Sequence, residues 1–206
     1  MRKRKWLAVG LAVCLLLAGL SGCAGQQRQL RVTLVLKTVT EVAEFWGTLL
    51  SGVEKAAAEY GVELKVLTAP REVDIDEQSE LIRQVTAEKP DVMILSASDY
   101  DRCAEATEEA IAAGIGVVAV DTDVNAAGRA CFVGSNNYEV GLEMGRAMAS
   151  YLPEGGKVAV IQHMLTTTTG IDRTRGVIDA LTKAGNIEIL GSFCCDNSTD
   201  RAQSLT

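Results

Sequence analysis

Several side chains that could bind a small polar molecule follow short apolar runs in this sequence. Two adjacent aromatic residues, Phe45 and Trp46, follow the first run, and Asp99, Tyr100 and Asp121 follow two later runs. Aromatic rings contact the apolar faces of a ligand, and carboxylates accept charge-assisted hydrogen bonds from hydroxyl groups. We therefore expect a site for a small polar ligand, with no cofactor and no metal.

Each of these residue types also has a purely structural use. Trp46 begins the apolar stripe of an amphipathic stretch and can belong to the core. Asp99 can cap a helix that begins near Asp101. Arg173 offers a planar fork that binds hydroxyls or a carboxylate, and its alternative is a surface salt bridge. His163 is the only histidine and has no catalytic partner at a recognisable spacing, so we expect no enzyme.

Short runs rich in β-branched residues alternate with amphipathic stretches along the chain, which predicts repeated β-α-β units. Continuous apolar runs such as 117–120 are typical of parallel strands covered by helices on both faces. Ligands of such sheets bind beyond the carboxyl ends of the strands, where the candidate residues lie. The expected strands are 30–36, 62–67, 92–95, 117–120, 131–133, 158–162 and 188–192.

The order of these elements predicts an α/β protein with two doubly wound parallel-sheet lobes. We expect an N-terminal ligand-binding lobe over residues 30–134 and a partial C-terminal ligand-binding lobe over 135–206. The second lobe supplies two clear strands, whereas an ordinary sheet has about five to six. We therefore expect the sequence to be a fragment with its second lobe truncated, and expect that lobe to be poorly stable alone because an edge is unpaired.

The first residues have the features of a targeting segment. Basic residues at 2–5 precede an apolar stretch at 6–20, which is shorter than the roughly 20 residues of a membrane-spanning helix. This pattern predicts a signal peptide over residues 1–22. The ending Leu20-Ser21-Gly22-Cys23 looks like a bacterial lipobox, which implies lipidation of Cys23, a spacer up to residue 29 and an extracytoplasmic, membrane-anchored protein. The alternatives are an ordinary signal peptide with a chance cysteine, or an uncleaved anchor.

The charge and the cysteines limit the remaining classes. Residues 1–22 hold four basic and no acidic residues, so without them the formal net charge falls from −7 to −11. Such a chain repels nucleic acid and anionic lipid surfaces, and we expect no nucleic-acid partner. No C-x-x-C spacing supports a metal or redox site. We expect Cys103 and Cys131 to be buried core residues. The alternative is a disulfide that links Cys194 or Cys195 to one of them.

Several segments, in this order and spacing, resemble the periplasmic sugar-binding proteins of the ribose and galactose type. They are Glu44–Trp46, Gly52–Leu64, Lys89–Ser96, Ala113–Asp121, Phe132–Gly141 and Asp172–Gly176. The resemblance implies a type I periplasmic binding fold that holds a sugar or polyol in a cleft between two lobes. It also implies a monomeric lipoprotein that delivers this ligand to an ABC permease at the membrane.

The resemblance also implies roles for single residues. Asp121 matches the ligand-binding aspartate that follows the fourth strand of the family, and Arg173 matches its second-lobe arginine. Asp200 lies in a segment similar to the next contact of the family. Ser135 and Asn136 match the hinge crossing, where a few residues absorb the change in backbone angles as the lobes rotate.

The chain departs from the family pattern at positions that would name the sugar. Ala43-Glu44 stands where relatives usually have Asn-Pro, Thr122 where an arginine is common, and Thr199 where an aromatic is common. A sensor that feeds a chemoreceptor or histidine kinase is the main alternative function. A repressor domain would have a DNA-binding helix-turn-helix in place of the signal, and the nucleotide and hydrolase motifs are absent from the sequence.

Overall fold

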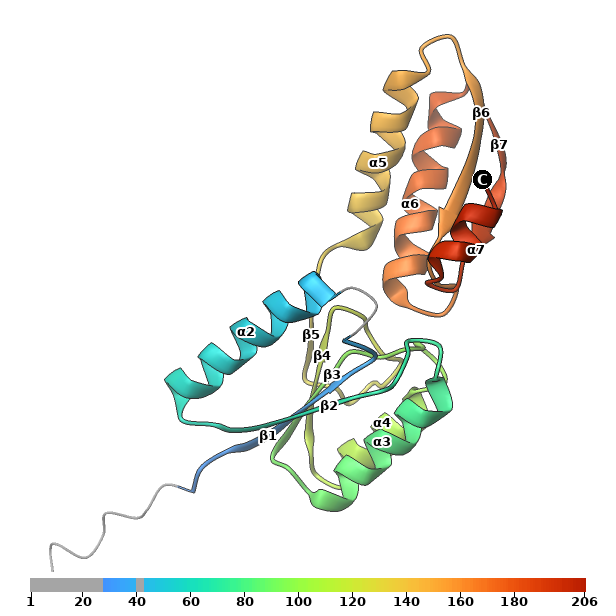
Figure 1. The fold of residues 1–206 in the computed structure, drawn as a ribbon. Helices are drawn as coiled ribbons and strands as arrows, with labels where there is room; N and C mark the ends of the chain where they lie inside the picture. Colours follow the sequence, from blue (N-terminus) through green and yellow to red (C-terminus); the bar gives the residue numbers. More distant parts are fainter. Residues whose placement is uncertain (1–27, 40–42) are drawn as a thin grey trace, which may run out of the picture.

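The computed structural model of this chain describes residues 28–39 and 43–206, which form two α/β parts (Figure 1). The expected signal segment and lipidation site Cys23 lie outside the described residues. We call the part built on the first sheet the N-terminal lobe and the part from residue 137 onward the C-terminal lobe. No helix in the described part of the chain combines the length and the apolar character needed to cross a membrane.

The N-terminal lobe contains a parallel sheet of five strands in the order β2-β1-β3-β4-β5. Parallel neighbours need a crossover connection, which α2, α3 and α4 provide between β1 and β4, whereas residues 121–130 join β4 to β5 without a helix. The parallel α/β prediction is therefore confirmed. The elements are β1 (Arg31–Leu36), α2 (Ala43–Tyr60), β2 (Glu63–Thr68), α3 (Ile75–Glu88), β3 (Val92–Leu95), α4 (Ala104–Ala112), β4 (Gly116–Val120) and β5 (Cys131–Val133).

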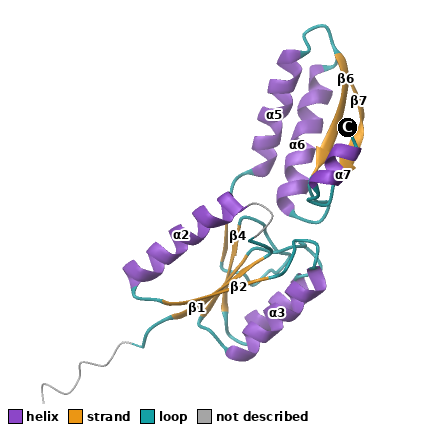
Figure 2. Ribbon diagram, viewed as in Figure 1, coloured by secondary structure: helices purple, strands orange, loops and turns teal. Residues whose placement is uncertain are grey.

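Helices cover both faces of this sheet, as Figure 2 shows with α2 on one side and α3 on the other. Successive side chains of a strand point to opposite faces. In β1, Leu34 and Leu36 pack with Trp46 of α2, while Val35 packs with Ile82 of α3 on the opposite side. All three β1 side chains are fully buried, which explains why this strand is a continuous apolar run.

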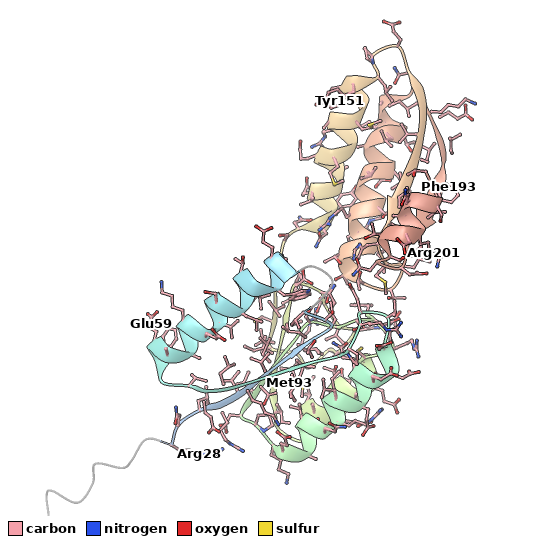
Figure 3. All side chains as sticks on the ribbon, in the orientation of Figure 1. Arg28, Glu59, Met93, Tyr151, Phe193 and Arg201 are labelled. Carbon is pink, nitrogen blue, oxygen red and sulfur yellow. The ribbon has the colours of Figure 1, made fainter. Side chains whose placement is uncertain are left out.

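The C-terminal lobe is a parallel pair of strands packed against helices. Its elements are α5 (Asn137–Tyr151), β6 (Gly156–Gln162), α6 (Thr168–Ala184), β7 (Ile187–Cys194) and α7 (Thr199–Ser204). Helices α5 and α6 touch through glycine: a Cβ placed on Gly141 would lie 2.1 Å from the carbonyl oxygen of Arg173. Figure 3 places Met93 inside the N-terminal lobe and Tyr151 at the end of the C-terminal lobe farthest from it.

The described cysteines only partly match their expected positions. Cys103 is fully buried in the core beside α3 and α4, as expected. Cys131 is exposed and not buried, because β5 is an edge strand that pairs with β4 alone and all three of its residues are exposed. Both of these cysteines, together with Cys194 and Cys195, are free thiols in the structure.

Candidate ligand-binding cleft

A cleft of about 320 Å³ lies between the two lobes. Three of its residues are the first to follow a strand: Lys37 after β1, Asp121 after β4 and His163 after β6. Parallel strands end at the same edge of a sheet, so the first sheet brings Lys37 and Asp121 to one place, and His163 comes from the end of a strand in the second sheet. The complete lining is Lys37, Phe45, Trp46, Glu72 and Asp121 from the N-terminal lobe and His163, Thr169, Arg173 and Asn197 from the C-terminal lobe.

The backbone at Asp121 directs two neighbouring side chains in opposite directions. Asp121 adopts a left-handed conformation with φ of 64°, and its N–H donates to the carbonyl of Val133. Its carboxylate lines the cleft. Thr122 is fully buried, and its hydroxyl donates to the carbonyl of Ala97 at 2.7 Å. The departure from the family at Thr122 therefore lies inside the lobe and not on the cleft wall.

A buried ion pair forms the floor of the cleft. Lys37 Nζ lies 2.6 Å from Glu72 Oε1 and 3.4 Å from Asp121 Oδ2. The side chains of Lys37 and Glu72 are only 6% and 4% exposed. A charge removed from water is costly unless it is paired, so the three groups depend on one another. Together they leave one net negative charge on the N-terminal wall.

The two aromatic residues have different roles. The Phe45 ring is 46% exposed, whereas Trp46 is 2% exposed and packs with Leu34 and Leu36. The rings meet edge to face, with centroids 4.9 Å apart and an interplanar angle of 80°. Only an edge of Trp46 can reach the cleft at that burial. Phe45 therefore supplies the ring face, and Trp46 supports it from the core.

The C-terminal wall has one cation and one imidazole. Arg173 Nη2 donates to Asn137 Oδ1 at 2.5 Å, while its Nε is buried without a hydrogen-bond partner among the described residues. His163 Nε2 lies 3.4 Å from the hydroxyls of Thr167 and Thr169. Burial lowers the pKa of His163, with Glu72 opposing that shift. The imidazole is therefore neutral near pH 7 and can donate or accept a hydrogen bond.

Three residues expected at the site do not line the cleft. Asp99 is 6% exposed, and one of its carboxylate oxygens accepts from the N–H groups of Asp101 and Arg102, as in the capping alternative. The backbone of Tyr100 bonds to Thr166 and Asn125. Asp200 is exposed in the first turn of α7. Asp99 thus serves a local turn and Asp200 faces solvent, and none of the three residues lines the cleft beside Asp121 and Arg173.

The connection between the lobes runs through Ser135 and Asn136, between β5 and α5. The side chain of Asn136 accepts from the N–H of Glu139 and caps α5. The hinge role of these two residues stays a prediction. Among the described residues, no group of three His, Cys, Asp or Glu side chains is placed to hold a metal ion.

Sequence reasoning did not assign five cleft residues to the site: Lys37, Glu72, His163, Thr169 and Asn197. A signal was available for Lys37, because it directly follows an apolar run typical of a buried strand, and a lysine buried there needs an acidic partner. Thr169 belongs to a hydroxyl-rich loop after β6. Glu72 and Asn197 lie in loops with no local pattern that marks them.

Comparisons with known proteins identify relatives of the chain. A family model described as a periplasmic binding protein domain matches residues 33–206. A D-ribose/D-allose-binding protein of Pseudomonas aeruginosa is 26% identical over 192 residues, which cover 89% of this chain and 60% of that protein. The chain thus spans about three fifths of the length of this curated relative.

Solved structures with similar folds include two proteins that handle sugars. A sugar transporter from Clostridium phytofermentans is 28% identical with a TM-score of 0.79, covering 85% of this chain and 65% of its own. A glucose-galactose-binding protein from Geobacillus stearothermophilus is 27% identical with a TM-score of 0.79, covering 87% of this chain and 63% of its own.

Proposed function

Because the chain belongs to the periplasmic binding protein domain family, we propose that it captures a sugar or related polyol between its two lobes. The observation that carries the proposal is the composition of the cleft. The cleft is lined by the exposed ring of Phe45 and the carboxylate of Asp121 from one lobe and by the guanidinium of Arg173 from the other. Two related proteins are named for binding ribose and allose, and glucose and galactose, which supports a monosaccharide as the ligand.

The chemistry of these groups complements a sugar. Phe45 would contact the apolar C–H face of the ring, and Asp121 would accept hydrogen bonds from hydroxyls. Arg173 Nε, which has no hydrogen-bond partner in the described part of the chain, would donate to a ring or hydroxyl oxygen. Since these groups come from both lobes, a bound sugar favours the arrangement in which the lobes are close. The cleft volume of about 320 Å³ is at the small end of ligand sites.

The cellular role in this proposal is that of a lipoprotein outside the cytoplasm. The signal-like segment and the lipobox-like ending at Cys23 support an acyl anchor. The relative from Clostridium phytofermentans, which is named a sugar transporter, supports delivery of the sugar to an ABC permease. We propose that the protein acts as a monomer and as a binding protein, not as an enzyme.

A panel of sugars tests the ligand class. The panel contains D-ribose, D-allose, D-glucose, D-galactose and inositol, each at millimolar concentration with the full chain. We expect at least one to stabilise the protein by about 3 kcal/mol when its concentration is 100-fold above Kd, as read by the shift in Tm. The variants Asp121→Asn and Arg173→Met should lose that shift, while Asp200→Asn, outside the cleft, should keep it. If no sugar stabilises the wild-type protein, the proposed ligand class is wrong.

Phe45 can be tested separately from stability. The change Phe45→Ala removes a ring that is already 46% exposed, so the free energy of unfolding should fall by less than about 1 kcal/mol. The Kd for the stabilising sugar should rise about 10-fold, because the stacking face is lost. Titration calorimetry measures the Kd. Tyr60→Ala is the control, since Tyr60 ends the same helix and is 76% exposed; an equal loss of affinity in both variants would contradict the assignment.

A further inference from the structure

One contact in the cleft joins the two lobes through protein atoms alone. Asn197 Nδ2 donates to Glu72 Oε2 at 3.0 Å, and these residues are separated by 125 positions in the chain. The other carboxylate oxygen of Glu72 lies 2.6 Å from Lys37 Nζ. Both oxygens are thus engaged by the protein itself. We propose that Glu72 and Asn197 form a latch that favours the closed arrangement of the lobes before a sugar binds, an inference that rests on the proposed function.

The loop that carries Asn197 is built to present it. Asp196 and Asn197 both adopt left-handed conformations, with φ of 47° and 56°. This region is unfavourable for most residues, and Asp and Asn tolerate it best among residues other than glycine. The N–H of Asn197 donates to the carbonyl of His163 at 2.9 Å, and Asp196 forms an ion pair with Arg201. Figure 3 places Arg201 at the end of the C-terminal lobe that faces the N-terminal lobe.

The environment of Glu72 strengthens this bond. Its side chain is 4% exposed, so water competes little for the carboxylate. A hydrogen bond to an ionised acceptor is stronger than one between neutral groups. Lys37 holds one carboxylate oxygen of Glu72 in an ion pair, and the other oxygen accepts from the amide of Asn197. The same carboxylate therefore links the cleft floor to the opposite lobe.

A latch of this kind changes the affinity for sugar without contact to the sugar. The apparent Kd equals the Kd of the closed form divided by the fraction of molecules that are closed. A latch that raises this fraction moves the apparent affinity toward its intrinsic value. Asp121, Phe45 and Arg173 then contribute the ligand contacts, while Glu72 and Asn197 set how often these groups are close together.

Two backbone amides report on closure directly. The N–H of Tyr100 donates to the carbonyl of Thr166 at 2.9 Å, and the N–H of Asp123 donates to the hydroxyl of Thr168 at 3.0 Å. Both bonds cross from the N-terminal to the C-terminal lobe. An amide that loses its acceptor when the lobes separate exchanges its proton faster. Residue-resolved hydrogen exchange on the full chain, without sugar, therefore measures the closed fraction.

The decisive variant is Asn197→Asp, which keeps the size of the side chain and replaces the donor by an acidic group facing Glu72. Exchange at the Tyr100 and Asp123 amides should become about 10- to 100-fold faster, while the amides of β3 stay unchanged. The double variant Glu72→Gln/Asn197→Asp reverses donor and acceptor and should restore slow exchange. Asn186→Asp is the matched control, because its amide donates to Pro153 at a distance from the cleft.

Three results would overturn the latch. The first is unchanged exchange at both amides in Asn197→Asp, and the second is faster exchange that the double variant does not reverse. The third is a loss of sugar affinity without any change in exchange, which would make Asn197 a ligand contact. If Asn197→Asp does not fold, Asn197→Ala removes the donor without adding charge and should still raise exchange at both amides. The exchange experiment contains no sugar, so its result is independent of the sugar panel. The latch can be wrong although a sugar stabilises the protein, and the latch can be right although no sugar in the panel does.

Discussion

Replacing Lys37 with methionine is expected to lower the free energy of unfolding by about 3–5 kcal/mol. The change leaves Glu72, which is 4% exposed, without its cation at 2.6 Å. It also removes the cation 3.4 Å from Asp121, so two carboxylates that shared one ammonium group face each other. The cost arises mainly from the uncompensated buried charge and not from the attraction that is lost.

Urea unfolding measures the effect of Lys37→Met, and Lys65→Met is its control. Lys65 pairs with Glu88 at 2.7 Å, but these side chains are 47% and 48% exposed, so its loss should cost less than about 1 kcal/mol. The double variant Lys37→Met/Glu72→Met should recover most of the loss, because an apolar pair replaces the ion pair. A Lys37→Met protein as stable as Lys65→Met would show that the cleft floor is hydrated, contrary to the burial seen here.

The change Gly141→Ala is expected to lower the free energy of unfolding by about 3 kcal/mol. The added Cβ would lie 2.1 Å from the carbonyl oxygen of Arg173 and 2.9 Å from its carbonyl carbon. Backbone atoms cannot rotate away, so α5 and α6 must separate. Alanine is favoured over glycine within a helix by about 1 kcal/mol, and the clash has to exceed this gain. The backbone that moves carries Arg173, so affinity for sugar should fall as well.

Gly52→Ala is the matched control for Gly141→Ala. Gly52 lies in α2, and an added Cβ there meets nothing within 4 Å. The same chemical change should therefore stabilise the protein by about 0.5–1 kcal/mol. Urea unfolding of both variants at one temperature gives the comparison. Stabilisation by Gly141→Ala of similar size would mean that α5 and α6 are not in close contact.

Strand and helix positions follow from the sequence with small errors. The expected strand 92–95 matches β3, and 131–133 matches β5, while β7 extends two residues beyond the expected end at 192. Patterns that span a few residues predict these elements: runs of β-branched residues indicate strands, and apolar residues spaced three to four positions apart indicate helices. The exposure of Cys131 was missed because a strand at the edge of a sheet has the same local pattern as a central strand.

The candidate site was predicted in part. Phe45, Trp46, Asp121 and Arg173 line the cleft, and each follows a strand or lies in the first turns of a helix. Asp99 meets the same criterion, but its carboxylate is used by the N–H groups of the next turn. Position after a strand shows where a residue is in the fold. It does not show which way the side chain turns.

The sequence by itself determined the alternation of strands and helices, and with it the edge at which a ligand can bind, because both depend on short-range periodicity. Only the tertiary structure decided that Lys37 is buried between Glu72 and Asp121, and that Asn197 reaches Glu72 across the lobes. Those contacts form because charged and polar side chains that are buried together need partners, and here the partners are distant in the sequence. A local sequence pattern therefore does not predict them.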